Sequence, residues 1–122
     1  MNYMDFKVSP LKALITIADL EKIDIRVGTI MAVEAVSGSE KLVRLKVDFG
    51  DHRRSILAGI KQERADPTSI EGTQALFVVN LEPRKMMGEY SEGMLFDIGY
   101  ADNLLPVLAV PEGPVPNGTR AG

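Results

Sequence analysis

Apolar and polar residues alternate along several short segments of this chain, and few folds accommodate that pattern. From Val43 to Phe49 every second residue is apolar, and the residues between them are charged. Successive side chains of a β-strand point to opposite sides, so this period of two predicts a strand with one buried and one exposed face. The same alternation runs from Ile23 to Val27. The chain is therefore expected to fold as a sheet around one core.

Turn residues between the predicted strands define the rest of the expected architecture. A hairpin turn is expected at residues 49–52, where Gly50 supplies backbone freedom. Asp66 is expected to cap a single helical turn that starts at Pro67 and ends at Gly72. The predicted strands are residues 22–36, 43–49, 54–60, 75–80, 93–98 and 104–110. Their length and spacing predict an all-β fold, a five-stranded and partly open barrel with a C-terminal extension.

Residues 1–20 are expected to form an appendage to a domain of residues 21–122. Pro10 can open a short helix over residues 11–15, because its missing N–H costs nothing in the first helical turn. A helix this short needs a surface to pack on, which could be the barrel or a second subunit. The first ten residues do not resemble a signal peptide, and no apolar run approaches the ~18 residues that cross a bilayer. No contact with a membrane is therefore predicted.

Charge is distributed unevenly along the 122 residues, whose net charge is −3. An acidic chain is an unusual nucleic-acid binder, since such proteins are mostly basic. However, residues 41–64 contain seven cations against three anions, whereas residues 97–122 contain one cation against three anions. The chain can therefore present one positive face, with a modest and salt-sensitive affinity. It has no cysteine and one histidine, His52, so neither a metal site nor another cofactor is predicted.

Residues 80–94 combine groups that suit the recognition of RNA. Two adjacent cations follow a proline, two methionines come next, and a Ser-Glu-Gly-Met sequence opens the next predicted strand. Cations pair with phosphates, apolar faces pack on bases, and a serine with a glutamate can read base edges. The simpler interpretation is that the cations protect a turn and that Met94 belongs to the core. The residues concerned are Arg84, Lys85, Met86, Met87, Ser91, Glu92, Gly93 and Met94.

This segment resembles the signature of the tRNA-binding domain family of the oligonucleotide/oligosaccharide-binding (OB) fold. That family includes the C-terminal domain of methionyl-tRNA synthetases, free-standing tRNA-binding proteins and CsaA-type secretion chaperones. The similarity covers roughly residues 18–122, with further matching segments at residues 24–30, 41–50, 58–60 and 114–119. It implies a five-stranded OB-fold barrel, to which the sequence adds a short N-terminal helix. Ala58 stands where many relatives have serine, which removes one hydroxyl from the implied binding face.

The resemblance implies that Ser91 and Met94 face bound tRNA and that the preceding cations contact its phosphates. For Arg26 and Lys46, which project from strands opposite to the apolar positions, contact with nucleic acid and simple solvation stay open. Asn80 is expected mainly to hydrogen-bond a neighbouring loop and so to position the cationic segment. Arg53 and Arg54 are secondary candidates. The predicted tRNA-binding residues are Arg26, Lys41, Lys46, Asn80, Arg84, Lys85, Ser91, Glu92 and Met94.

No catalytic constellation is recognised, because His52 in a predicted turn lacks an evident partner that would orient it toward a nucleophile. The chain is therefore not expected to be an enzyme. Three functions stay open: structure-selective tRNA binding, with a role as an accessory subunit of an aminoacyl-tRNA synthetase; a CsaA-type chaperone for unfolded export clients; and a dimerisation module. Apolar residues at both ends of the chain predict a homodimer with two-fold symmetry. A cytoplasmic location is expected.

Overall fold

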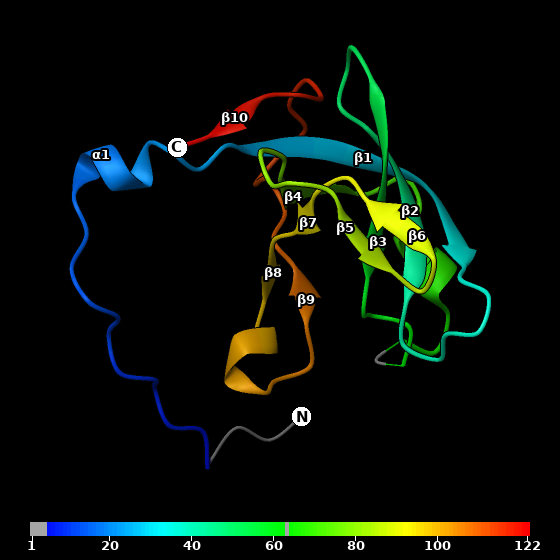
Figure 1. Ribbon diagram of the computed structural model, residues 1–122, viewed down its shortest axis with the longest axis horizontal. Helices are drawn as coiled ribbons and strands as arrows, with labels where there is room; N and C mark the ends of the chain where they lie inside the picture. Colours follow the sequence, from blue (N-terminus) through cyan, green and yellow to red (C-terminus); the bar gives the residue numbers. More distant parts are fainter. Residues whose placement is uncertain (1–4, 63) are drawn as a thin grey trace.

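An antiparallel sheet curls around one core and gives the molecule the form of a half-barrel (Figure 1). This computed structural model describes residues 5–62 and 64–122. The main sheet has the strand order β3-β2-β1-β4-β7, and β10 pairs with the start of β1. The strands are β1 (Ile25–Ala35), β2 (Val43–Asp48), β3 (Arg53–Ala58), β4 (Gln74–Val78), β7 (Met94–Leu95) and β10 (Arg120–Ala121). The expected all-β barrel is therefore confirmed. Residues 1–4 of the predicted appendage, and Glu63, lie outside the described residues.

Alternating side chains fill the core, as the period of two predicts. β2 buries its apolar residues and turns Arg44, Lys46 and Asp48 toward the other face. A register shift between Ile30 and Ala32 interrupts the pairing of β1 with β2, and such irregularities bend a strand. The largest fully buried side chains are Phe77, Ile30, Leu45, Ile56 and Val47. They come from four different strands, so the core holds the strands in one fixed arrangement.

The turn chemistry is also as predicted. Gly50, between β2 and β3, has a φ of +98°, a value that favours glycine, and an added Cβ would lie 2.6 Å from the Asn117 carbonyl oxygen. A 3₁₀ turn, η1 (Pro67–Ile70), begins behind Asp66, whose carboxylate accepts from the Thr68 N–H. Each of these local signals acts within a few residues, so it can be read without knowledge of the fold.

The C-terminal part contains shorter strands than predicted. The segment 93–98 is divided into β7 and β8 (Asp97–Ile98), and β8 pairs with β9 (Val107–Leu108) in a separate two-stranded sheet. A short turn, η2 (Tyr100–Asp102), lies between them. The predicted strand 104–110 begins only after Pro106, because proline has no N–H to donate to a ladder. The extension is tied to the barrel where the Leu76 N–H donates to the Ala109 carbonyl at 3.0 Å.

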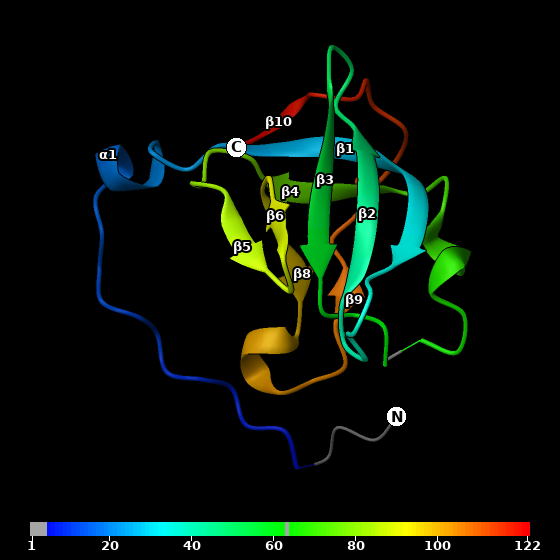
Figure 2. The ribbon, with the colours of Figure 1, turned by 45° about the vertical axis from the view of Figure 1, so that its right-hand side comes forward.

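The predicted N-terminal helix at residues 11–15 is wrong in position. Those residues have no regular secondary structure, and a four-residue helix, α1 (Ile17–Leu20), follows instead. Its start is set by a capping box, in which the Thr16 hydroxyl accepts from the Asp19 N–H and the Asp19 carboxylate accepts from the Thr16 N–H. The segment 5–16, here called the arm, passes outside the barrel in Figures 1 and 2, and its Ser9 hydroxyl donates to the Asp102 carboxylate of η2. No helix in the described part of the chain is long and apolar enough to cross a membrane.

Candidate nucleic-acid interface

The cationic signature forms a β-hairpin, where the sequence indicated only a loop. β5 (Arg84–Met86) pairs with β6 (Glu89–Ser91), and β6 lies beside β3 (Figure 2). Met87 and Gly88 make the turn, with φ values of 50° and 81°. Positive φ at both central positions is the backbone of a two-residue type I′ turn, which suits the twist of the strands. The hairpin 84–91 therefore presents its cations from a defined backbone.

An ion pair anchors the tip of the hairpin to β2. The Arg44 guanidinium donates to both carboxylate oxygens of Glu89, with an Nε–Oε1 distance of 2.7 Å, and to Glu34 at 3.2 Å. The hydrogen bond from Arg44 lowers the pKa of Glu89 below its usual value, and the same contact raises the pKa of Arg44. Two carboxylates thus neutralise Arg44, so this residue of the basic segment contributes little to a positive face.

Ser91 and Glu92 join β3 to the segment between β6 and β7. The buried Ser91 hydroxyl accepts from the Leu57 N–H at 2.9 Å and donates to the Gly93 carbonyl at 2.8 Å. The Glu92 N–H donates to the Ser55 carbonyl, and the Glu92 carboxylate accepts from the Ser55 N–H at 3.0 Å. The Ser91 and Glu92 side chains thus accept from β3 N–H groups that a neighbouring strand would otherwise pair with, and they close the barrel next to β3. Their predicted contact with tRNA stays a prediction, and their observed contacts are structural.

Exposed cations and apolar side chains gather around the hairpin. Arg84, Lys85 and Lys46 are all exposed, and Lys46 lies near enough to Glu89 to lower the pKa of that carboxyl further. The Lys85 ammonium lies 6.0 Å from the centre of the Tyr90 ring. Tyr90 is 60% exposed and Met94 is 47% exposed, which disfavours the core interpretation of Met94.

The loop before β2, which contains Lys41, meets the turn of the hairpin at Gly38. Lys41 is exposed, and Gly38 in the same loop lies against the Met87 side chain, with an added Cβ placed 3.4 Å from Met87 Cε. The loop is held in place where the Ser39 hydroxyl accepts from the Leu42 N–H at 2.9 Å. We group the exposed cations and the exposed apolar side chains of the hairpin and of the segments next to it as the hairpin face: Lys41, Lys46, Arg84, Lys85, Tyr90 and Met94.

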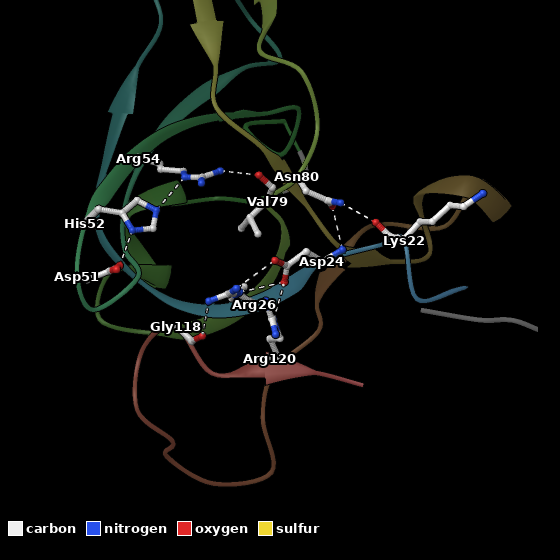
Figure 3. A network of polar contacts seen from close by, with 10 residues as sticks. All are labelled: Lys22, Asp24, Arg26, Asp51, His52, Arg54, Val79, Asn80, Gly118 and Arg120. Atoms are coloured by element: carbon white, nitrogen blue, oxygen red, sulfur yellow. Dashed lines mark hydrogen bonds and ion pairs between the residues drawn. The ribbon is translucent and has the colours of Figure 1, made fainter. Parts of the chain in front are cut away.

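Arg26 and Asn80 belong to a separate polar network (Figure 3). Arg26 forms a two-bond ion pair with Asp24, at 3.0 and 3.1 Å, and also donates to the Gly118 carbonyl. The hydrogen bond from Arg26 lowers the pKa of the Asp24 carboxyl. The Asn80 amide accepts from the Asp24 N–H at 2.9 Å and donates to the Lys22 carbonyl at 2.6 Å, the structural role expected for it. A tRNA contact by either residue stays a prediction.

An open cleft at the root of the hairpin was not foreseen from the sequence. Its volume is about 440 Å³, and it lies between the β2–β3 turn and the two chain segments that lead into and out of the hairpin. Arg54 reaches across it, whereas the sequence indicated only a secondary contact with nucleic acid. No local pattern could have revealed this cleft, because Arg54 is 25 positions from Val79 and 38 positions from Glu92 in the sequence. The lining residues are His52, Arg53, Arg54, Val79, Leu81, Pro83 and Glu92.

Comparison with known proteins places this geometry in a family. Residues 25–120 match the family model described as "Putative tRNA binding domain". A methionyl-tRNA-synthetase-related protein from Pyrococcus horikoshii has a similar structure, with 32% identity, a TM-score of 0.83, and coverage of 91% of this chain and 100% of that one. The CsaA chaperone of Bacillus anthracis has 29% identity and a TM-score of 0.77, covering 90% of this chain and 100% of its own.

Two further structures extend the similarity. The CsaA chaperone protein of Picrophilus torridus has 28% identity and a TM-score of 0.77, with coverage of 89% of this chain and 100% of that chain. The C-terminal domain of Plasmodium vivax p43 has 27% identity and a TM-score of 0.71, with coverage of 84% of this chain and 61% of that chain. The matched region includes β1 to β9, and with them the cationic hairpin, and ends at the first residue of β10. The chain therefore belongs to the tRNA-binding domain family.

Proposed function

We propose that this protein binds folded tRNA through the hairpin face and acts as an accessory subunit for an aminoacyl-tRNA synthetase. The observation that carries the proposal is the hairpin itself, which exposes Arg84, Lys85 and Tyr90 on a backbone fixed by the Arg44–Glu89 ion pair. Cations positioned in this way meet phosphate groups, and an exposed aromatic ring beside them offers a stacking surface for a base. The role is binding, and we assign no catalytic step to the chain.

The expected affinity is modest because few cations are available. Lys41, Lys46, Arg84 and Lys85 are exposed at the hairpin face, whereas Arg44 is neutralised by its carboxylate partners. Four phosphate contacts correspond to a slope of about −3 when the logarithm of the association constant is plotted against the logarithm of salt concentration. A net charge of −3 adds a weak long-range repulsion.

A titration of the protein with folded tRNA at several salt concentrations tests this proposal. We expect saturable binding at about 50 mM salt that weakens along the stated slope, and weaker binding to unstructured RNA of the same length. The unstructured RNA serves as the control for simple attraction between charges. Absence of binding to folded tRNA at about 50 mM salt, or equal affinity for both RNAs, would contradict structure-selective binding.

Met94→Ala is expected to weaken tRNA binding without changing the salt slope. A packing contact with a base releases no counterion, so its loss affects affinity equally at all salt concentrations. Because Met94 is 47% exposed, we expect the melting temperature to stay within about 2 °C of the unchanged protein. Thermal unfolding and the same titration measure both quantities. A drop of many degrees in melting temperature would instead support the core interpretation of this residue.

A CsaA-type chaperone is the second candidate, because exposed apolar side chains surround the same hairpin. Leu81, Met87, Tyr90 and Met94 are all exposed, and a flexible methionine suits irregular apolar clients. The two CsaA chaperones match this chain almost as well as the synthetase-related protein does. Suppression of the aggregation of an unfolded client at stoichiometric concentrations, together with no affinity for tRNA, would favour this function over the first.

We further propose that the protein is a homodimer in the cytoplasm, where tRNA and synthetases are found. Apolar side chains at both ends of the chain support the dimer because the single chain leaves them exposed: Leu11, Leu14, Ile15, Ile17, Ile98, Leu105, Val107 and Val110. A large exposed apolar surface usually marks an interface, and a self-complementary surface closes by two-fold symmetry. Two hairpin faces in one dimer would raise the affinity for a single tRNA.

A further inference from the structure

One side chain connects the two ends of the cationic hairpin. The Arg54 Nη1 atom donates to the Val79 carbonyl at 2.6 Å, before the hairpin, and to the Glu92 carbonyl at 3.1 Å, after it (Figure 3 shows the first of these contacts). Val79 and Glu92 are separated by 12 residues that include all of β5 and β6. A single nitrogen therefore draws together the two points at which the hairpin leaves and rejoins the barrel.

Arg54 is itself held in one orientation by the turn between β2 and β3. Its Nε donates to His52 Nε2 at 3.0 Å, and the guanidinium carbon lies 5.8 Å from the centre of the Phe49 ring. Because Nε2 accepts this hydrogen bond, the neutral ring carries its proton on Nδ1 and donates it to Asp51 at 2.6 Å. The Arg54 Nε atom therefore donates to the ring of His52, and its Nη1 atom donates to the two carbonyls at the ends of the hairpin.

Its neighbour Arg53 provides a contrast within the same strand. Arg53 is exposed and lies opposite Asp48, whereas Arg54 is half-buried and lies opposite Val47. Successive residues of a strand point to opposite faces, so the two guanidinium groups have different surroundings despite equal charge. Arg53 is therefore available to contact solvent or phosphate. Arg54 instead spends its hydrogen bonds on other segments of the protein.

We propose that Arg54 is a positioning residue that fixes the hairpin 84–91 in its tRNA-binding geometry and does not itself contact phosphate. The inference rests on the proposed tRNA binding by the hairpin face. Ser91 and Glu92 attach the outgoing end of the hairpin to β3. At the incoming end the Val79 N–H donates to the Asp24 carbonyl, and Arg54 adds the attachment of Val79 to β3. Without that attachment the hairpin is less ordered in the free protein. Binding of tRNA then costs additional conformational entropy, and the affinity falls.

Arg54→Ala and its matched control Arg53→Ala test the proposal, since each removes one positive charge from β3. In the free protein, we expect faster amide hydrogen exchange over residues 80–92 for Arg54→Ala only. In tRNA titrations, we expect Arg54→Ala to lower affinity about tenfold but to have almost no further effect once Arg84 and Lys85 are both alanine. Arg53→Ala should lower affinity only a few-fold and add to that double variant.

Arg54→Lys separates geometry from charge and covers the case in which the alanine variant does not fold. Lysine keeps the charge but has one compact ammonium group that cannot reproduce the fixed fork of arginine. We expect this variant to show the same faster exchange and most of the loss in affinity. Unchanged exchange over residues 80–92 in both Arg54 variants, or an affinity loss additive with the hairpin double variant, would overturn the proposal. Because the exchange measurement uses no tRNA, it remains decisive even if tRNA binding is absent.

Discussion

The double substitution of Arg84→Ala and Lys85→Ala is expected to lower the affinity for tRNA about 30-fold at 50 mM salt. Both side chains are exposed on β5, and each phosphate contact contributes about 1 kcal/mol, so together they stabilise the complex by about 2 kcal/mol. The salt slope should flatten by about 1.5, because two fewer counterions are released. Titration with folded tRNA at several salt concentrations measures both effects in one experiment.

A control variant with the same net charge makes this result specific to the hairpin. Lys7 and Lys12 are exposed in the arm, and their joint replacement by alanine removes two positive charges away from β5. We expect this control to change affinity less than threefold, because exposed charges beyond a Debye length of about 10 Å are largely screened. Equal losses in both double variants would show that the hairpin attracts tRNA only through overall charge. A folded hairpin variant with unchanged affinity would refute the proposed face.

Leu14→Asp is expected to convert a dimer into a monomer at micromolar concentration. Leu14 is 98% exposed in the single chain, so the substitution should leave the fold of that chain unchanged. At a two-fold interface each subunit loses about 2 kcal/mol of apolar burial, and the combined loss of about 4 kcal/mol weakens the dimer roughly a thousandfold. Light scattering should show twice the 13.3 kDa chain mass for the unchanged protein.

Met31→Asp serves as the control for a loss of surface hydrophobicity alone. Met31 is 44% exposed on β1, outside the two apolar ends, so we expect this variant to stay dimeric. A monomeric mass for the unchanged protein would exclude the dimer. The exposed apolar residues of the arm would then not be covered by a second subunit. Dissociation of both variants would place the interface on β1 as well as on the arm.

The sequence alone predicted the elements whose signals are local. Alternation of side chains from Val43 to Phe49 defined β2, because neighbouring residues of a strand must point to opposite faces. Gly50 and the Asp66–Pro67 pair marked turns that depend on φ and on one nearby hydrogen bond. The signature at residues 80–94 identified both the family and the segment that carries the exposed cations.

The tertiary structure decided what those residues contact, because each contact joins segments far apart along the chain. Arg44 is one of the seven cations of residues 41–64, yet Glu89, 45 positions away, neutralises it. The arm presents a helical spacing of apolar residues, but with no surface of its own barrel beneath it a helix at 11–15 gains no burial. Likewise, Arg53 and Arg54 are equivalent in the sequence, and only the neighbouring Val79 and Glu92 carbonyls distinguish them. Strand pattern is therefore a property of adjacent residues, whereas charge compensation and positioning depend on which strands the fold brings together.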